Sequence, residues 1–179
     1  MEDPAPYALL NSLTDNPTVG DERNFFRVRL DEKGTTYSDS IDVKPGDVVL
    51  VSLWLRNAAA DNLAGPAATI HGLQCQLYVP VAAKDLPLGA TLQAKNATTV
   101  WDGAMIHSTT PISVQIVNGS AEFSTNQADY KLPDSLGKGE WTTLGETGPD
   151  GEFPVGLDND GRGQGTAWLL YKLIVVAAN

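Results

Sequence analysis

The sequence contains a single cysteine, Cys75, so no disulfide can form within the chain. Stability must come from an ordinary hydrophobic core, and 179 residues are enough to bury one in a single domain. Cys75 alternates with glutamines over residues 73–79. No motif supplies a partner base for a catalytic thiol, so we expect a small apolar core residue.

Basic residues are scarce: 12 Lys and Arg stand against 22 Asp and Glu, and the formal net charge is -10. Nucleic acids and anionic lipids attract cationic surfaces, so this composition argues against both as natural partners. The acids are spread evenly, with 12 in residues 1–89 and 10 in residues 90–179. This distribution predicts a solvated acidic surface rather than an acidic binding tail.

Long hydrophobic runs are also missing. The apolar run over residues 167–171 is interrupted by Lys172 and is far too short to cross a bilayer, so we expect no membrane span in this chain. Residues 1–4 lack the basic and apolar regions of a signal peptide. We therefore expect a mature or trimmed chain whose signal peptide is not in this sequence.

Helical periodicity is almost absent, and residues 7–13 offer the best candidate, about two turns long. Elsewhere short runs of alternating apolar and polar residues are separated by turn residues. Strands are expected over 25–30, 41–43, 48–55, 73–79, 90–95, 98–102, 112–117, 120–123, 141–144 and 167–176. Parallel strands need crossover helices, so this pattern predicts an all-β, antiparallel two-sheet β-sandwich with long irregular loops.

Two turns are marked by their residue types. Lys44-Pro45-Gly46-Asp47 joins two expected strands, with proline fixing φ and glycine accepting a positive φ. Asn118-Gly119 lies between two alternating runs. This dipeptide favours a type I′ hairpin, because such a turn needs positive φ at both positions.

The chain divides into an N-terminal segment over residues 1–23 and a single β-sandwich domain over residues 24–179. Within the domain, residues 126–166 show little regular pattern and hold eight acids but only three bases. Irregular stretches of this length are uncommon in compact domains and tend to be functional or mobile. We therefore look first in this irregular excursion for a cation or a partner.

Four stretches point to a family: residues 43–57 (VKPGDVVLVSLWLRN), 116–123 (IVNGSAEF), 165–176 (GTAWLLYKLIVV) and 16–26 (NPTVGDERNFF). Together they resemble the immunoglobulin-like conserved-repeat modules of bacterial cell-surface and secreted proteins. The resemblance spans residues 14–176, but residues 58–72 and 126–166 are additional to the usual module. It implies an immunoglobulin-like sandwich, an extracellular or cell-surface location, and a structural or adhesive role without catalytic residues.

A calcium site is the first candidate for bound chemistry. Asp158 and Asp160 lie in an Asp-Asn-Asp-Gly run, and Asp150 precedes them. Carboxylates and carbonyls on a glycine-rich turn are the ligands that Ca²⁺ prefers. The spacing is not that of an EF-hand, since the fifth and twelfth positions from Asp158 are Arg162 and Leu169. The alternative is a solvated turn with no metal. No other cofactor is expected.

The four tryptophans give a second candidate. Trp54 and Trp168 lie in apolar strands and are expected in the core, whereas Trp101 and Trp141 are expected to be exposed. Exposed aromatic rings beside polar groups would form a platform on which sugars stack, with Asp102 or Glu140 bonding the sugar hydroxyl groups. The alternative is that all four pack inside the sandwich.

The two histidines, His71 and His107, have no metal-ligand spacing and no neighbouring nucleophile and base, so we expect ordinary loop residues. Without an acid/base pair or triad, a hydrolase is unsupported. The sequence thus predicts a non-catalytic structural, assembly or adhesion module. Its expected partners are other copies, bound through strand edges, or cell-surface molecules. The alternative function is a carbohydrate-binding module that uses Trp101 and Trp141.

Overall fold

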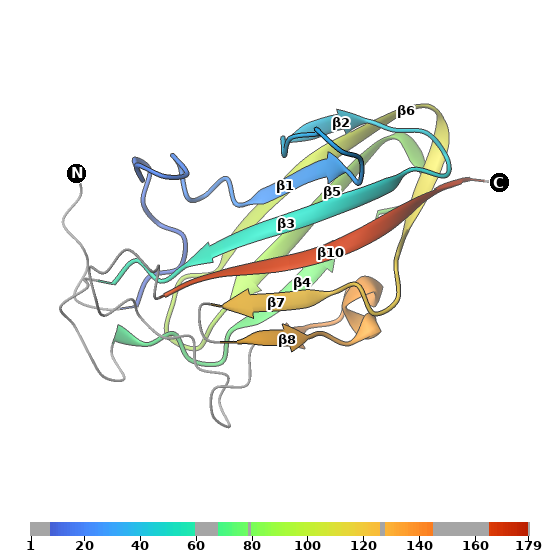
Figure 1. Cartoon of the computed structure of the whole chain (residues 1–179). Coiled ribbons are helices and arrows are strands. Elements are labelled where there is room, and N and C mark those ends of the chain that lie inside the picture. Colours follow the sequence, from blue (N-terminus) through green and yellow to red (C-terminus); the bar gives the residue numbers. More distant parts are fainter. Residues whose placement is uncertain (1–7, 60–67, 79, 126–127, 145–164, 179) are drawn as a thin grey trace.

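The computed structural model describes residues 8–59, 68–78, 80–125, 128–144 and 165–178, and over these it is an all-β protein (Figure 1). The strands are β1 (Phe26–Leu30), β2 (Ser40–Asp42), β3 (Val48–Arg56), β4 (Gln74–Tyr78), β5 (Ala83–Gln93), β6 (Val100–Ile116), β7 (Glu122–Thr125), β8 (Asp129–Lys131), β9 (Thr142–Thr143) and β10 (Thr166–Ala177). The 3-10 helix η2 (Asp134–Lys138) lies between β8 and β9 in the chain. The strands form a ten-stranded sheet, antiparallel except where β2 pairs with β6. Within the described residues, no helix is long and apolar enough to cross a membrane.

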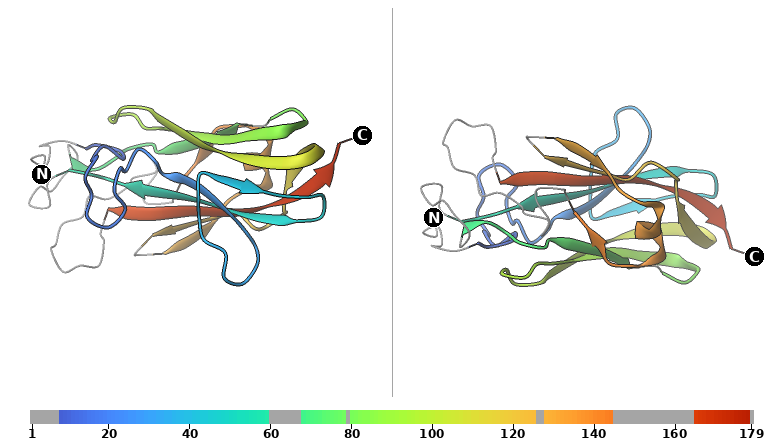
Figure 2. Two further views of the ribbon diagram at one scale, coloured as in Figure 1. Left: turned by 90° about the horizontal axis from the view of Figure 1, so that it is seen from above. Right: turned by 90° about the horizontal axis from the view of Figure 1, so that it is seen from below.

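Strand β6 folds this sheet back on itself. Its first part pairs with β5 from Val100 to His107 and, beyond a register shift, again at Ile112, and its last part pairs with β10 from Ile112 to Ile116. The strands consequently lie in two layers (Figure 2): β1, β3, β10, β7 and β8 on one side, and β4, β5 and β9 on the other. The sequence predicts two separate strands here, and this is wrong because β6 runs unbroken through Gly103 and Pro111.

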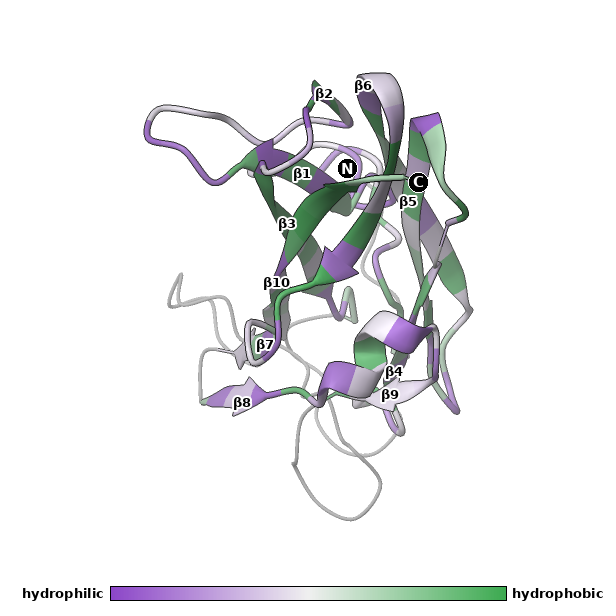
Figure 3. Cartoon of the chain, turned by 90° about the vertical axis from the view of Figure 1, so that its right-hand side faces the viewer, coloured by the Kyte–Doolittle hydropathy of each residue, from purple (hydrophilic) through white to green (hydrophobic). Residues whose placement is uncertain are grey.

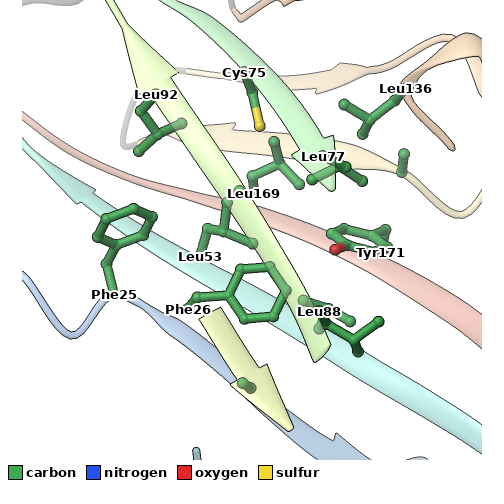
Figure 4. Packing of buried hydrophobic residues seen from close by; sticks show 14 of the residues in the cluster. Phe25, Phe26, Leu53, Cys75, Leu77, Leu88, Leu92, Leu136, Leu169 and Tyr171 are labelled. Carbon is green, nitrogen blue, oxygen red and sulfur yellow. The ribbon is translucent and has the colours of Figure 1, made fainter. Parts of the chain in front are cut away.

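The hydrophobic core lies between the two layers. Alternate residues of β3 point inward, and Val49, Val51, Leu53 and Leu55 are fully buried. Figure 4 shows Leu53 and Leu169 of one layer packed with Cys75 and Leu77 of the other. The expectation that Cys75 is a core residue is confirmed. Burial raises the pKa of its thiol to about 12, so the nucleophilic thiolate is not available at neutral pH.

The chain before β2 closes one long side between the layers. Val28 of β1 and Ser38 exchange two backbone hydrogen bonds of 2.9 Å, and β2 then pairs with β6. The Met105 amide of β6 donates to the Asp39 carbonyl, away from β5. Met105 lies opposite Pro87 of β5, and because its amide points away from β5 this pair exchanges no backbone hydrogen bonds. The missing N–H of Pro87 therefore removes no bond between β5 and β6.

Residues 132–144 close the other long side. The Leu132 amide donates to Ala121 of one layer, and the Leu144 amide donates to Leu73 of the other. Both leucines and Leu136 of η2 are buried, and Figure 3 shows η2 between the strands β7 and β8 and the strands β4 and β9. The expected irregularity of residues 126–166 is therefore wrong for residues 128–138, which hold β8 and η2, whereas the short strand expected over 141–144 is confirmed as β9. Residues 145–164 lie outside the described part of the chain.

The prediction of a hairpin at Asn118-Gly119 is also wrong. The end of β6 and strand β7 do not pair with each other; they pair one after the other with the same edge of β10. Gly119 has a φ of 70°, but Asn118 is not left-handed, which excludes a type I′ turn. Between the two strands, the Ser120 hydroxyl accepts the Lys172 amide and maintains the link to β10. At this dipeptide the chain passes from β6 to β7, and both strands stay along the same edge of β10. The turn at residues 44–47 is confirmed, with Gly46 at a φ of 96°.

The N-terminal segment is anchored by a buried carboxylate. No helix forms over residues 8–13, because Leu10 instead bridges to Asn57 beyond the end of β3. Glu22 is fully buried and accepts hydrogen bonds from Arg56 Nη1 at 2.8 Å, Asn16 Nδ2 at 2.8 Å and the Leu13 amide at 3.1 Å. These bonds hold residues 13–22 against β3.

Leu136 tests whether residues 132–144 support the fold. Replacing this fully buried residue, L136A, should lower the free energy of unfolding by about 2–5 kcal/mol, because it leaves a cavity between the layers. Denaturant unfolding measures the effect, and K138A in the same helix is the control. Equal stability of L136A and K138A would show that this segment is not part of the core.

The Glu22–Arg56 pair should respond asymmetrically to the loss of each partner. R56M leaves a buried carboxylate without its cation and should cost about 3 kcal/mol. E22Q should cost about 1–2 kcal/mol, because the Arg56 side chain is 29% exposed and can be hydrated. Urea denaturation of both variants measures the difference. A larger loss in E22Q than in R56M would contradict this account.

Candidate functional site

The most exposed tryptophan among the described residues lies on the outer face of the β4–β5–β6 layer. Trp101 of β6 is 67% exposed, and Tyr78 of β4 on the same face is 54% exposed. Soluble proteins usually bury most of the surface of such large rings. Two exposed aromatic residues on one sheet face mark it as a candidate ligand-binding surface.

The strand register brings these side chains into two rows. In the first row, Trp101 pairs with Thr91 of β5, which pairs with Gln76 of β4. In the second row, Tyr78 of β4 pairs with Gly89 of β5, which pairs with Gly103 of β6. The indole of Trp101 lies over Gly89: a Cβ built there would stand 3.4 Å from both Cζ2 and Nε1 of the ring. The glycine thus leaves room for the indole to lie against bare backbone.

A groove of about 300 Å³ opens on this face. It is lined by Gln76, Leu77, Tyr78, Thr91, Trp101, Lys138 and Gly139. The Gln76 amide nitrogen donates to the Gly139 carbonyl at 2.9 Å, which fixes the side chain at the groove wall. The Gln93 amide likewise donates to Gln74 at 3.0 Å. Aromatic faces beside fixed amides and a hydroxyl suit a ligand with both apolar faces and many hydroxyl groups.

Trp141 lies on the same outer face, but it does not line the groove. It is 40% exposed and comes directly before β9. Thr142 is buried opposite Cys75, so the alternation of side chains turns Trp141 outward. Extending the β4–β9 register by one residue places Trp141 beside Gln76, at the end of the row that begins at Trp101.

The expectation that Trp54 and Trp168 lie in the core is wrong, because neither is among the buried residues. Trp168 is 41% exposed and stands directly opposite Trp54 on the outer face of β3 and β10. Both strands are apolar on two faces, but in the described structure only the inner face meets the other layer. A second groove, of about 240 Å³, lies near Trp54 and includes Tyr37 and Arg27.

Asp102 fixes the strand behind Trp101. Its side chain turns toward the other layer and accepts the Phe26 amide at 2.7 Å and the Gly103 amide at 2.8 Å. Burial raises the pKa of this carboxyl, although these amide hydrogen bonds oppose the effect and the nearby Asp39 adds to it. Asp102 therefore joins β1 to β6, and each of its carboxylate oxygens already accepts a backbone amide.

A pH series tests the position of Asp102. Because the pKa of Asp102 is raised in the folded state, protonation of this carboxyl stabilises the fold. The stabilisation is fully present below about pH 3.9, and it is lost as the pH rises through the raised pKa. The stability of the wild type relative to D102N should decrease over that range. Urea unfolding at several pH values measures the difference, and a wild-type advantage that grows with pH would contradict the assignment.

Among the described residues, the titratable groups outside this face lie apart from one another or in pairs. His107 lies in β6, so its expected place in a loop is wrong; its Nδ1 is 2.7 Å from Asp85 Oδ1, and both side chains are exposed. In the described part of the chain, no three His, Cys, Asp or Glu residues gather as metal ligands. Asp150, Asp158 and Asp160 lie outside the described residues, so the calcium site stays a prediction.

Comparison of the chain with family models, curated proteins and solved structures gave no significant match. The resemblance to conserved-repeat surface modules therefore stays a prediction. The side chains on the outer face of β4, β5 and β6 are the feature of the described structure from which a function can be inferred.

Proposed function

We propose that this chain is a non-catalytic carbohydrate-binding module that acts in adhesion outside the cell. The observation that carries the proposal is the row formed by Trp101, Thr91 and Gln76, with Tyr78 beside it. The polar residues orient a ligand through hydroxyl groups, and the aromatic rings cover the apolar faces of its sugar rings. Both kinds of contact are present in one groove.

Charge favours a neutral glycan. The chain has a net charge of -10, so an acidic polysaccharide would be repelled at long range. Among the described residues that line the groove, Lys138 is the one with a charge, and the neighbouring carboxylate of Asp102 accepts backbone amides. The groove thus offers neutral hydrogen-bonding groups in greater number than charges.

The immunoglobulin-like sandwich and the bacterial cell-surface location belong to the same proposal. The two layers of strands and the turn before β3 support the sandwich, as does the long last strand β10 that follows a glycine. Adhesion to a surface glycan would agree with such a location. A calcium ion bound by Asp150, Asp158 and Asp160 would be compatible with this role.

Assembly of copies through strand edges has less support. Edge strands that invite pairing are long and flat, whereas β8 and β2 have three residues each and β9 has two. The longer edge of β1 is partly covered, because Val28 bonds to Ser38. Self-association stays a prediction of the sequence, and carbohydrate binding is the function that the geometry supports best.

A glycan array followed by calorimetry with the best neutral glycan tests the proposal. W101A and Y78A should each weaken binding by about tenfold or more, because each removes an exposed aromatic contact surface. W168A, which removes an exposed ring from the opposite layer, is the matched control and should bind as the wild type does. The absence of binding to any glycan, or equal losses in all three variants, would contradict the proposal.

A further inference from the structure

We infer that this face recognises a linear, neutral oligosaccharide that crosses the strands from Trp101 to Trp141 and is longer than a disaccharide. The inference rests on the proposed function and adds the shape and minimum length of the ligand. It follows from the position of one residue outside the groove, Trp141, relative to the residues within it.

The register fixes the direction of the ligand. Trp101, Thr91 and Gln76 lie in a straight row across β6, β5 and β4, perpendicular to the strands. Continuation of the β4–β9 register places Trp141 next in the same row, on the same outer face. A ligand that contacts both tryptophans must therefore run across the strands.

The width of the row sets the length. Neighbouring strands are about 4.8 Å apart, so the three steps from Trp101 to Trp141 span about 14 Å between backbones. One sugar ring, or two linked rings, is shorter than this path. A short ligand can stack on Trp101 alone, and only a longer chain can also reach Trp141.

The middle of the row is polar. The Thr91 hydroxyl and the Gln76 amide lie between the two aromatic residues, and the Gln74–Gln93 amide pair flanks them on the same face. Gln76 keeps its carbonyl oxygen for a ligand, because its hydrogen bond to Gly139 uses the amide nitrogen. A chain stacked at its two ends would thus find donors and acceptors for its central hydroxyl groups.

Calorimetry with ladders of neutral, linear oligosaccharides tests the inference. The probes are β-1,4-linked glucose, mannose and xylose chains and α-1,4-linked glucose chains, each from the monosaccharide to the hexasaccharide. With the class that binds, we expect the affinity to rise by about tenfold between the disaccharide and the longer chains. W141A should abolish this increase, so that it binds the hexasaccharide no more tightly than the disaccharide, whereas W101A should weaken binding at every length. W168A is the matched control, and thermal unfolding checks that all variants are folded.

The outcomes separate the inference from the proposed function. Equal affinity for the disaccharide and the hexasaccharide, or a length dependence that survives in W141A, would overturn the inference and leave carbohydrate binding intact. Failure of the wild type to bind any ladder or any glycan on the array would overturn both. Preferential binding of a branched or acidic glycan would overturn the shape and charge assigned here.

Discussion

Strand β6 provides hydrogen bonds to both layers, and the rest of the structure depends on this continuity. Its first part holds β5, while its last part holds β10. Because one unbroken strand serves both layers, their separation and register are coupled. Asp102 adds to this coupling, since its carboxylate reaches from β6 to the Phe26 amide of β1. The same strand bears Trp101 one residue earlier, so the candidate site stands on a well-fixed part of the sheet.

The rigidity of that strand matters for binding. A side chain on a paired strand loses little further freedom when a ligand arrives, which lowers the entropic cost of association. The Trp101 indole is further confined by Gly89, whose missing side chain leaves the ring a place against the backbone. On the opposite wall, Gln76 is held by Gly139. The face is thus arranged in advance for a ligand with flat apolar rings and hydroxyl groups.

The sequence predicted the class of the fold because alternation and turn residues are local signals. The strands around Leu53 and Leu169 were predicted in this way, as was the burial of Cys75. Nonlocal pairing was not predictable. The Asn118-Gly119 dipeptide is typical of a hairpin, but the open edge of β10 takes the strands on both sides of it.

The candidate site was also predicted in part. Trp101 and Trp141 were expected on the surface, and they are 67% and 40% exposed. Their alignment through Thr91 and Gln76 depends on strand order, which the sequence does not encode locally. Tyr78 was not expected in the site, although its outward position in an alternating strand was a usable signal. The exposure of Trp168 was missed because a strand that is apolar on both faces is typical of a covered one.

The most direct test of the central claim is to map the ligand by NMR. Backbone amide shifts would be followed while a neutral oligosaccharide chosen from the array is added. The account predicts that the changes gather at Trp101, Thr91 and Gln76 on the outer face of β4, β5 and β6, together with the indole N–H of Trp101. Changes centred on Trp54 and Trp168, or none on either face, would contradict it.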